Sequence, residues 1–261
     1  MNNILRLENI FYSVSSSGKG FAKKSVVNIL DDINLNINYG EVLGISGESG
    51  GGKTTLAKVI AGIIKPSQGK LVWDDGVLSG NSSSNPVQIL FQNHGEILNP
   101  YRKIEDIINE ALKIQKYNSE SIKKKKEEIL NSLNISTDIT KRRGYELSGG
   151  EQQRAALARL LAANPNMLIL DEPFSAQDVE SQLNFLKLFQ KINGELKLTM
   201  LCVSHDLNIL RKLADRIVII QKGKVVEEGS TEEVFNNPAH DHTKYLLKAK
   251  NMSLTLSEMK E

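Results

Sequence analysis

The sequence predicts an α/β fold in which a mostly parallel sheet forms the core, with an antiparallel β subdomain and an inserted α-helical subdomain. Short, fully apolar runs at 42–45, 89–91, 167–170, 200–203 and 217–220 are typical of strands that are covered on both faces. Helical patterns lie between several of these runs, and strands alternating with helices favour parallel pairing. From about residue 93 to 164, apolar residues recur at helical spacing and strand signals vanish, which indicates the insertion.

The antiparallel subdomain is predicted from the first forty residues. Ile33, Leu35 and Ile37 alternate with asparagines, which is the pattern of a half-buried strand, and Leu5 and Leu7 indicate another. Both strands are expected at a sheet edge. Near the other end of the chain, 222–223 separates two apolar runs and predicts a hairpin turn, and 243–250 predicts a terminal helix.

Two helices are expected directly after buried strands. The residues that would share one face of the first are Leu56, Val59, Ile60 and Ile63. The residues that would share one face of the second are Leu207, Leu210 and Leu213. The run of four lysines at 123–126 is interpreted as the solvated face of a helix in the insertion rather than as a binding patch.

These elements predict a single domain over 1–261. Its catalytic α/β core is expected from 1–92 and 164–261, with the helical subdomain at 93–163. The formal net charge is only +2, and the basic and acidic residues are spread along the chain. The sequence therefore gives no electrostatic indication of nucleic-acid binding. Cys202 is the single cysteine, which excludes an internal disulfide and favours the cytosol. No signal-peptide pattern and no run of about 18 apolar residues is present, so a membrane role would require a separate partner.

The segment from Gly47 to Thr54 matches a phosphate-binding loop, and it lies between a predicted strand and a predicted helix. The pattern residues and their neighbours are Gly47, Glu48, Ser49, Gly50, Gly51, Gly52, Lys53, Thr54 and Thr55. Glycines let backbone N–H groups converge on phosphate oxygens, and the helix N-terminus offers partial positive charge. We expect Lys53 to reach the terminal phosphates of ATP and the Thr54 hydroxyl to ligate Mg²⁺.

Two carboxylates, Asp171 and Glu172, end the buried run at 167–170. Ligands of open α/β sheets collect at the carboxyl ends of strands. Asp171 can hold Mg²⁺ through water, and Glu172 can polarise the attacking water during phosphoryl transfer. Together with the phosphate-binding loop, this pair predicts a nucleoside triphosphatase.

A second glycine motif, 147–154, opens a predicted helix and reads Leu-Ser-Gly-Gly-Glu-Gln-Gln-Arg. With this motif the sequence resembles the ATP-binding cassette family, whose signature loop it matches from Leu147 to Gln153. Physically, Ser148, Gly149 and Gly150 form a second anion site at a helix N-terminus. Because one chain holds two phosphate sites, we predict that two chains pair head to tail and that the signature loop of each completes the ATP site of the other chain.

The resemblance implies roles for further residues and an ABC-type phosphate-loop ATPase core. Gln92 matches the glutamine that senses Mg²⁺ and water, and His205 matches the switch histidine near the γ-phosphate. The segment 175–178 resembles the dimer-contact loop, with Asp178 in place and Gln177 where leucine is more usual. The catalytic set is therefore Glu172, His205 and Gln92, and the metal set is Thr54, Gln92 and Asp171. The position of the adenine-stacking aromatic falls on Val14; Tyr12 could substitute or could merely pack.

The runs 91–100 and 226–247 are similar to the peptide and nickel importer branch of the family. This implies an ATPase subunit at the cytoplasmic face of the membrane that works with a second ABC ATPase subunit, identical or different, two permeases and an extracytoplasmic binding protein. The cargo stays open between peptides, nickel and a metal chelate. His240 and His242 alone are too few for a metal site. The alternatives are a soluble ABC ATPase that acts on nucleic acid or ribosomes, and a phosphate-loop kinase or GTPase, which would leave 147–154 unexplained.

Overall fold

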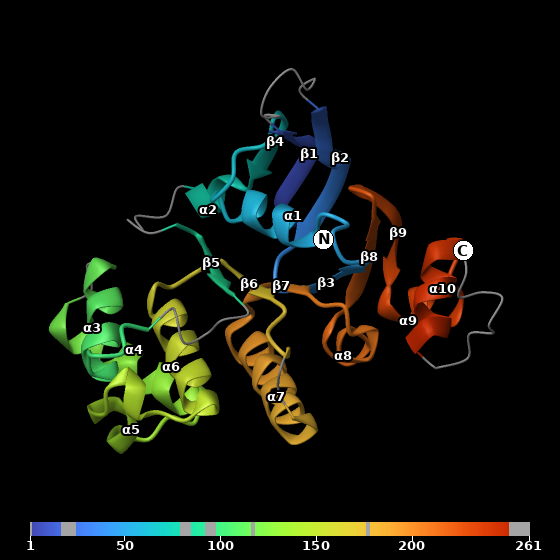
Figure 1. The fold of residues 1–261 in the computed structure, drawn as a ribbon. Helices are drawn as coiled ribbons and strands as arrows, with labels where there is room; N and C mark the ends of the chain where they lie inside the picture. Colours follow the sequence, from blue (N-terminus) through green and yellow to red (C-terminus); the bar gives the residue numbers. More distant parts are fainter. Residues whose placement is uncertain are drawn as a thin grey trace. The chain divides into compact units, whose positions relative to one another are not determined.

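The computed structural model describes residues 2–16, 25–78, 85–91, 98–115, 118–175 and 178–250. The chain divides into two compact units, the first formed by 1–74 and 201–261 and the second by 75–200 (Figure 1). The predicted helical subdomain, 93–163, lies inside the second unit, and its bounds stay a prediction. Within the described residues, none of the helices combines the length and the apolar character that crossing a membrane needs.

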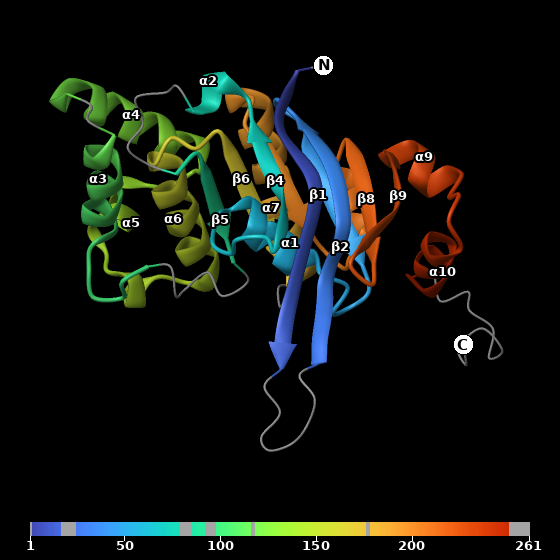
Figure 2. The ribbon, with the colours of Figure 1, turned by 90° about the horizontal axis from the view of Figure 1, so that it is seen from above.

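A three-stranded antiparallel sheet belongs to the first unit. It consists of β1 (Asn3–Ser16), β2 (Ser25–Asn38) and β4 (Gln68–Trp73), with β1 in the middle (Figure 2). The predicted alternation holds, because Leu5, Leu7, Ile33 and Ile37 are buried. The two strands predicted near the N-terminus are therefore confirmed as an antiparallel pair. The expectation that both lie at a sheet edge is wrong for β1, because β4 pairs along its other side.

The remaining strands of the first unit carry the candidate site. β3 (Val42–Gly47) pairs in parallel with β8 (Arg216–Gln221), and β8 pairs antiparallel with β9 (Lys224–Ser230) through the predicted turn at 222–223. Lys222 and Gly223 adopt positive φ angles of 47° and 79°, as tight hairpin turns require. The strand β7 (Thr199–Val203) contains the boundary between the two units.

Four helices of the first unit accompany these strands: α1 (Lys53–Ile60), α8 (Leu207–Leu213), α9 (Thr231–Asn236) and α10 (Asp241–Lys250). The buried leucines of α8 confirm the predicted helical face. The prediction that α1 extends to Ile63 is wrong. Gly62, at φ 72°, ends the helix because its N–H and that of Ile63 turn back to the carbonyls of Val59 and Lys58, which leaves Ile63 54% exposed.

The second unit contains a parallel strand pair and most of the helices. β5 (Val87–Leu90) pairs with β6 (Met167–Asp171). The described helical segments are α2 (Asp75–Leu78), α3 (Ile104–Ile114), α4 (Ser119–Ser132), α5 (Thr137–Lys141), the 3₁₀ turn Gly144–Glu146, α6 (Gly149–Ala162) and α7 (Val179–Leu196). The lysine run is on α4, but the prediction of a solvated face holds only for the exposed Lys123 and Lys124. Lys125 and Lys126 are half-buried, because they lie one helical turn before the buried Ile129 and Leu130 and share their face.

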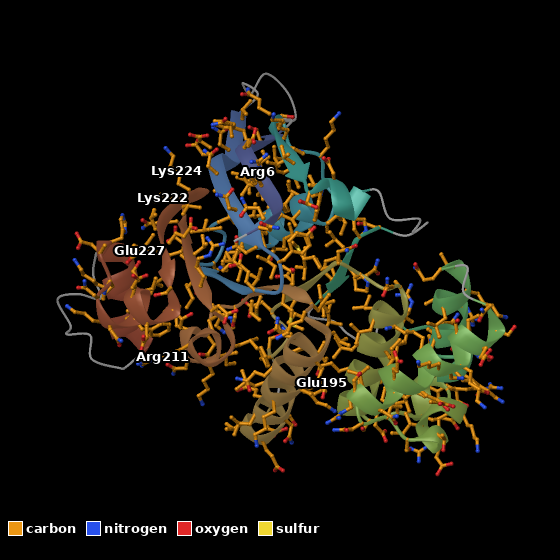
Figure 3. All side chains as sticks on the ribbon, turned by 180° about the vertical axis from the view of Figure 1, so that it is seen from behind. Arg6, Glu195, Arg211, Lys222, Lys224 and Glu227 are labelled. Atoms are coloured by element: carbon orange, nitrogen blue, oxygen red, sulfur yellow. The ribbon has the colours of Figure 1, made fainter. Side chains whose placement is uncertain are left out.

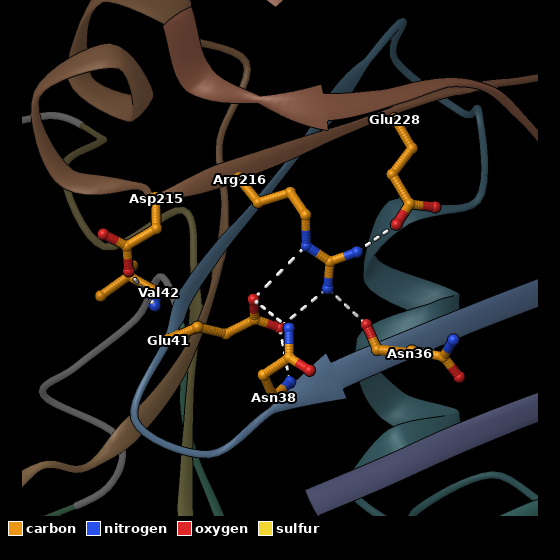
Figure 4. Close-up of polar contacts among 7 residues, drawn as sticks. All are labelled: Asn36, Asn38, Glu41, Val42, Asp215, Arg216 and Glu228. Atoms are coloured by element: carbon orange, nitrogen blue, oxygen red, sulfur yellow. Dashed lines mark hydrogen bonds and ion pairs between the residues drawn. The ribbon is translucent and has the colours of Figure 1, made fainter. Parts of the chain in front are cut away.

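An ion-pair network ties both sheets of the first unit together around Arg216 (Figure 4). The guanidinium donates to Glu41 at 2.8 Å, to Glu228 on β9 and to the backbone carbonyl of Asn36 on β2. The side chains of Arg216 and Glu41 are 19% and 10% exposed. Burial by itself lowers the pKa of Arg216, but the two carboxylates outweigh it and hold the pKa above its usual value. The network fixes the chain where it enters β3.

We predict that Arg216→Met destabilises the protein by about 2 kcal/mol, because it leaves the half-buried Glu41 carboxylate with hydrogen bonds from Asn38 but without its cation. Urea unfolding followed by circular dichroism measures the change. The matched control is Lys224→Met, which removes an exposed pair with Asp31 at 3.1 Å and should cost about 0–1 kcal/mol. Equal losses in the two variants would contradict the structural role of the network.

Candidate functional site

The loop from Gly47 to Thr54 joins β3 to α1 and has a backbone that only glycine can adopt at several points. Gly47, Gly50 and Gly52 have φ angles of 145°, 78° and 103°. A Cβ on Gly47 would lie 1.9 Å from the carbonyl oxygen of Ile220, and one on Gly52 would lie 2.7 Å from that of Ile29. The glycines therefore serve both the conformation of the loop and its close approach to neighbouring strands.

Hydrogen bonds hold this loop against the turn between β8 and β9. The N–H of Gly223 donates to the carbonyl of Gly51 at 3.1 Å, and the N–H of Asp31 donates to the carbonyl of Gly223 at 2.9 Å. A Cβ on Gly223 would meet the carbonyl oxygen of Ile29 at 2.6 Å. The sequence predicted the turn but not this supporting role, for which the local signal was only the glycine of the turn itself.

Lys53 is the cation of the loop. Its side chain is buried, and Nζ donates to the carbonyls of Gly47 at 2.9 Å and Glu48 at 2.8 Å. Thr54 is exposed and Thr55 is half-buried in the first turn of α1. An ammonium group, a helix N-terminus and a glycine backbone at one place fit the phosphates of a nucleotide.

His205 lies in the same unit as the loop. The N–H of the preceding Ser204 donates to the carbonyl of Ile45 on β3 at 3.0 Å. The following Asp206 caps α8 by accepting from the N–H groups of Asn208 at 2.9 Å and Ile209 at 3.4 Å. The backbone on both sides of His205 is therefore fixed, and its side chain is exposed.

In the second unit, Asp171 and Glu172 follow each other at the carboxyl end of β6, as predicted. Asp171 is buried, whereas Glu172 is half-buried and has a φ of 52°. Such a conformation is strained for a residue with a side chain and clusters at functional sites. The carbonyl of Glu172 accepts from the N–H of Ser175 at 3.3 Å and from its hydroxyl at 2.9 Å, which stabilises the strained backbone.

The second glycine motif forms the N-terminus of α6. Ser148 caps the helix, with its Oγ accepting from the N–H of Glu151 at 3.4 Å and its own N–H donating to the Glu151 carboxylate at 2.8 Å. The latter bond holds the pKa of Glu151 below its usual value. Gly149 and Gly150 are exposed, and a Cβ on either would meet nothing within 4 Å. Among the described residues, no neighbour therefore requires a glycine at either position.

Gln153 connects α6 to the segment after Glu172. Its side chain is 1% exposed, and Nε2 donates to the carbonyl of Pro173 at 3.0 Å. The sequence identified Gln153 only as part of the motif. Its partner is 20 residues away, so no local pattern could have predicted the contact.

Asp178 caps α7, because its carboxylate accepts from the N–H of Ser181 at 2.9 Å and from its hydroxyl at 2.7 Å. The backbone hydrogen bond in particular holds the pKa of Asp178 below its usual range. Gln92 and Gln177 lie outside the described residues. Tyr12 is half-buried and Val14 is 46% exposed, and a role of either in adenine stacking stays a prediction.

The structure thus places two groups of predicted residues in different units. The phosphate-binding loop and His205 belong to the first unit, and Asp171, Glu172 and the Ser148 motif belong to the second. Residues 30–175 match the family model described as ABC transporter. The chain belongs to the ABC transporter family.

Named relatives extend the ABC match to most of the chain. It is 35% identical to the oligopeptide transport ATP-binding protein OppF of Lactococcus lactis subsp. lactis, over 95% of this chain and 81% of that protein. It is 37% identical to the oligopeptide transport ATP-binding protein AmiF of Streptococcus pneumoniae, over 90% of this chain and 78% of that protein.

Solved ABC structures confirm the predicted fold class. CbiO1 from Clostridium perfringens, part of the ABC transporter complex cbiONQ, has a TM-score of 0.77 and 26% identity and covers 99% of this chain and 98% of its own. The ATP-binding cassette MJ0796, solved as a dimer bound to ADP and Pi, has a TM-score of 0.69 and 28% identity, over 87% of this chain and 98% of that one. As a member of this family, the protein is an ATP-binding and ATP-hydrolysing subunit of an ABC transporter.

Proposed function

We propose that this ABC ATPase powers a peptide importer and that it hydrolyses ATP between two chains arranged head to tail. The observation that carries the proposal is the pair of anion-binding features in one chain: a phosphate-binding loop with its lysine in one unit, and an exposed helix N-terminus at Ser148 in the other. The MJ0796 cassette, solved as a dimer, supports the arrangement.

The binding half of each site is assigned to the loop. The backbone N–H groups of 47–52 and the Lys53 ammonium bind the triphosphate, and Ser148, Gly149 and Gly150 of the partner chain close over it. The carbonyl bonds of Lys53 to Gly47 and Glu48 hold its ammonium at the loop before nucleotide arrives. The buried Asp171, the Thr54 hydroxyl and Gln92 provide oxygen ligands that suit Mg²⁺. When bound, this ion would neutralise the charge that develops on the phosphates.

The hydrolytic half is assigned to Glu172, His205 and Gln92. Glu172 accepts the proton of the attacking water, and hydrogen bonds from Ser175 to its carbonyl fix its strained backbone. His205, with its backbone fixed between β3 and the cap of α8, holds the γ-phosphate side of the site. Asp178 fixes the start of α7 and, with it, the segment that we assign to the contact between the two chains.

The helical subdomain, 93–163, is proposed to contact the permease. Tyr101 and Tyr145 are 75% and 58% exposed, and their ring centroids are 6.4 Å apart. Exposed aromatic pairs of this kind are enriched at protein interfaces. The partners would be two permease subunits and, through them, an extracytoplasmic binding protein. This places the chain peripherally at the cytoplasmic face of the membrane. The oligopeptide transport names of the relatives favour peptides over nickel or a metal chelate as cargo.

We predict that Glu172→Gln lowers the rate of ATP hydrolysis by about 10²–10⁴-fold and accumulates an ATP-bound dimer, because the water loses its base while the phosphates stay bound. Size-exclusion chromatography with ATP and a phosphate-release assay measure both effects. The companion variant, Lys53→Ala, should weaken nucleotide binding itself and yield no dimer. Parental hydrolysis by Glu172→Gln would show that another residue activates the water.

The importer assignment predicts that a tagged chain, expressed with the genes beside its own, co-purifies with two permease subunits. Vesicles that contain the complex and its binding protein should take up a labelled oligopeptide when ATP is supplied. Uptake should be absent with Glu172→Gln, which isolates the contribution of this chain. A chain that binds RNA in a salt-dependent way and recovers no membrane protein would contradict this assignment.

A further inference from the structure

The segment that leads into α10 is fixed to β9 by a charged hydrogen-bond acceptor, Glu227. The carboxylate of Glu227 accepts from the N–H of Ala239 at 2.7 Å and from that of His240 at 3.0 Å. Burial alone raises the pKa of Glu227, but these and further hydrogen bonds hold it below its usual value. Figure 3 shows Glu227 on the ribbon of β9, next to the terminal helices. The carboxylate therefore stays charged and keeps the start of α10 in place.

Two histidines of the same segment, His240 and His242, connect it to the end of β8. The N–H of His242 donates to Nδ1 of His240 at 3.1 Å. On its other side, Nδ1 of the His242 ring lies 3.1 Å from Nε2 of Gln221, the last residue of β8. Because an amide NH₂ group can only donate, His242 Nδ1 accepts, and the proton of the neutral ring is on Nε2. That nitrogen is buried and has no hydrogen-bond partner among the described residues.

Gln221 lies between two backbone contacts with the phosphate-binding loop. It is followed by the turn at 222–223, whose Gly223 N–H holds the carbonyl of Gly51. It is preceded by Ile220, whose carbonyl oxygen packs against Gly47. The two backbone contacts that define the loop therefore lie on either side of the one residue of β8 that His242 holds.

We propose that His242 is a positioning residue for the phosphate-binding loop: through Gln221 it fixes the end of β8 and the turn that supports Gly51, so the terminal helix sets the affinity for ATP. This inference rests on the proposed nucleotide site. It concerns a residue outside the motifs that bind or hydrolyse ATP, and it gives α10 a part in the ATPase cycle.

The charges around the ring give the proposal a pH dependence. The groups that face it are Glu48 of the phosphate-binding loop, which favours the imidazolium, and His240, which opposes it. Burial is the largest influence, and the pKa of His242 lies below its usual value of 6.5. The folded state therefore gains from the neutral ring above that pH, and loses this gain as the pH falls through the lowered pKa. A proton on Nδ1 would oppose the Gln221 donor and release the turn.

Two amide substitutions distinguish the contribution of Nδ1 from that of Nε2. His242→Asn keeps an acceptor near the position of Nδ1, whereas His242→Gln places its amide near Nε2 and loses the acceptor. The affinity of the full chain for a fluorescent ATP analogue should fall roughly five- to tenfold in His242→Gln and His242→Ala, the value of one hydrogen bond, and should stay near the parental value in His242→Asn. The KM for ATP should rise in the same proportion, with kcat within about twofold, because no reacting group is touched.

The pH comparison uses the same variants. As the pH is lowered from 7.5 through 6.5 to about 5, the parental chain should lose more affinity than His242→Asn, because the lowered pKa of His242 is crossed only in the acidic part of this range. Ionisation of the nucleotide affects both chains equally, so the difference reports the histidine. Gln221→Met should weaken binding as much as His242→Gln, and the double variant should be no worse than either, since both remove one contact.

The matched control is Lys244→Ala, on the same helix, which removes only an exposed pair with Asp241 at 3.0 Å and should leave affinity and melting temperature unchanged. Equal affinity in all His242 variants would overturn the inference while the proposed function stands. Equal losses in Asn, Gln and Ala, with a lowered melting temperature, would overturn it in favour of a purely structural role. A parental chain that binds no nucleotide, with Lys53→Ala indistinguishable from it, would overturn the proposed function and this inference with it.

Discussion

The approach of the phosphate-binding loop to the end of β8 is the constraint on which the rest of the structure depends. Gly47 passes so close to the carbonyl of Ile220 that a single methyl group could not be accommodated, and Gly51 is held by the next turn. With its backbone fixed on that side, the loop keeps its glycines and the Lys53 ammonium together at the start of α1, the combination that a phosphate group requires. The Arg216 network holds the other end of the same two strands, so the loop is supported at both ends of β3 and β8.

The second anion site contrasts with the first. In the phosphate-binding loop, positive φ angles account for Gly47, Gly50 and Gly52, whereas Gly149 and Gly150 have neither a positive φ nor a close neighbour among the described residues. A capped helix N-terminus with two exposed glycines can bind an anion that another molecule holds. The difference supports the proposal that the phosphate-binding loop of one chain holds the nucleotide and that the Ser148 motif of a second chain closes over it.

The sequence predicted most of the fold because its signals are local: alternation in β1 and β2, apolar runs in the buried strands, and glycine motifs at fixed spacing. It failed at the end of α1, where Ile63 continued the apolar pattern although Gly62 ends the helix. It also missed contacts that depend on tertiary structure. Gln153 with Pro173, Gly223 with Gly51 and Gln221 with His242 join residues that no spacing rule relates. The positive φ of Glu172 was equally invisible, since nothing in an Asp-Glu pair requires it.

The central claim is that two chains enclose each ATP, and disulfide crosslinking between them tests it most directly. The native Cys202 is buried, so single cysteines can be introduced with little background. A mixture of one chain carrying Ser49→Cys and another carrying Ser148→Cys should form a crosslinked dimer under mild oxidation only when ATP is present, and neither variant alone should do so. Crosslinking that ignores ATP, or crosslinking within one chain that carries both cysteines at high dilution, would contradict the head-to-tail arrangement.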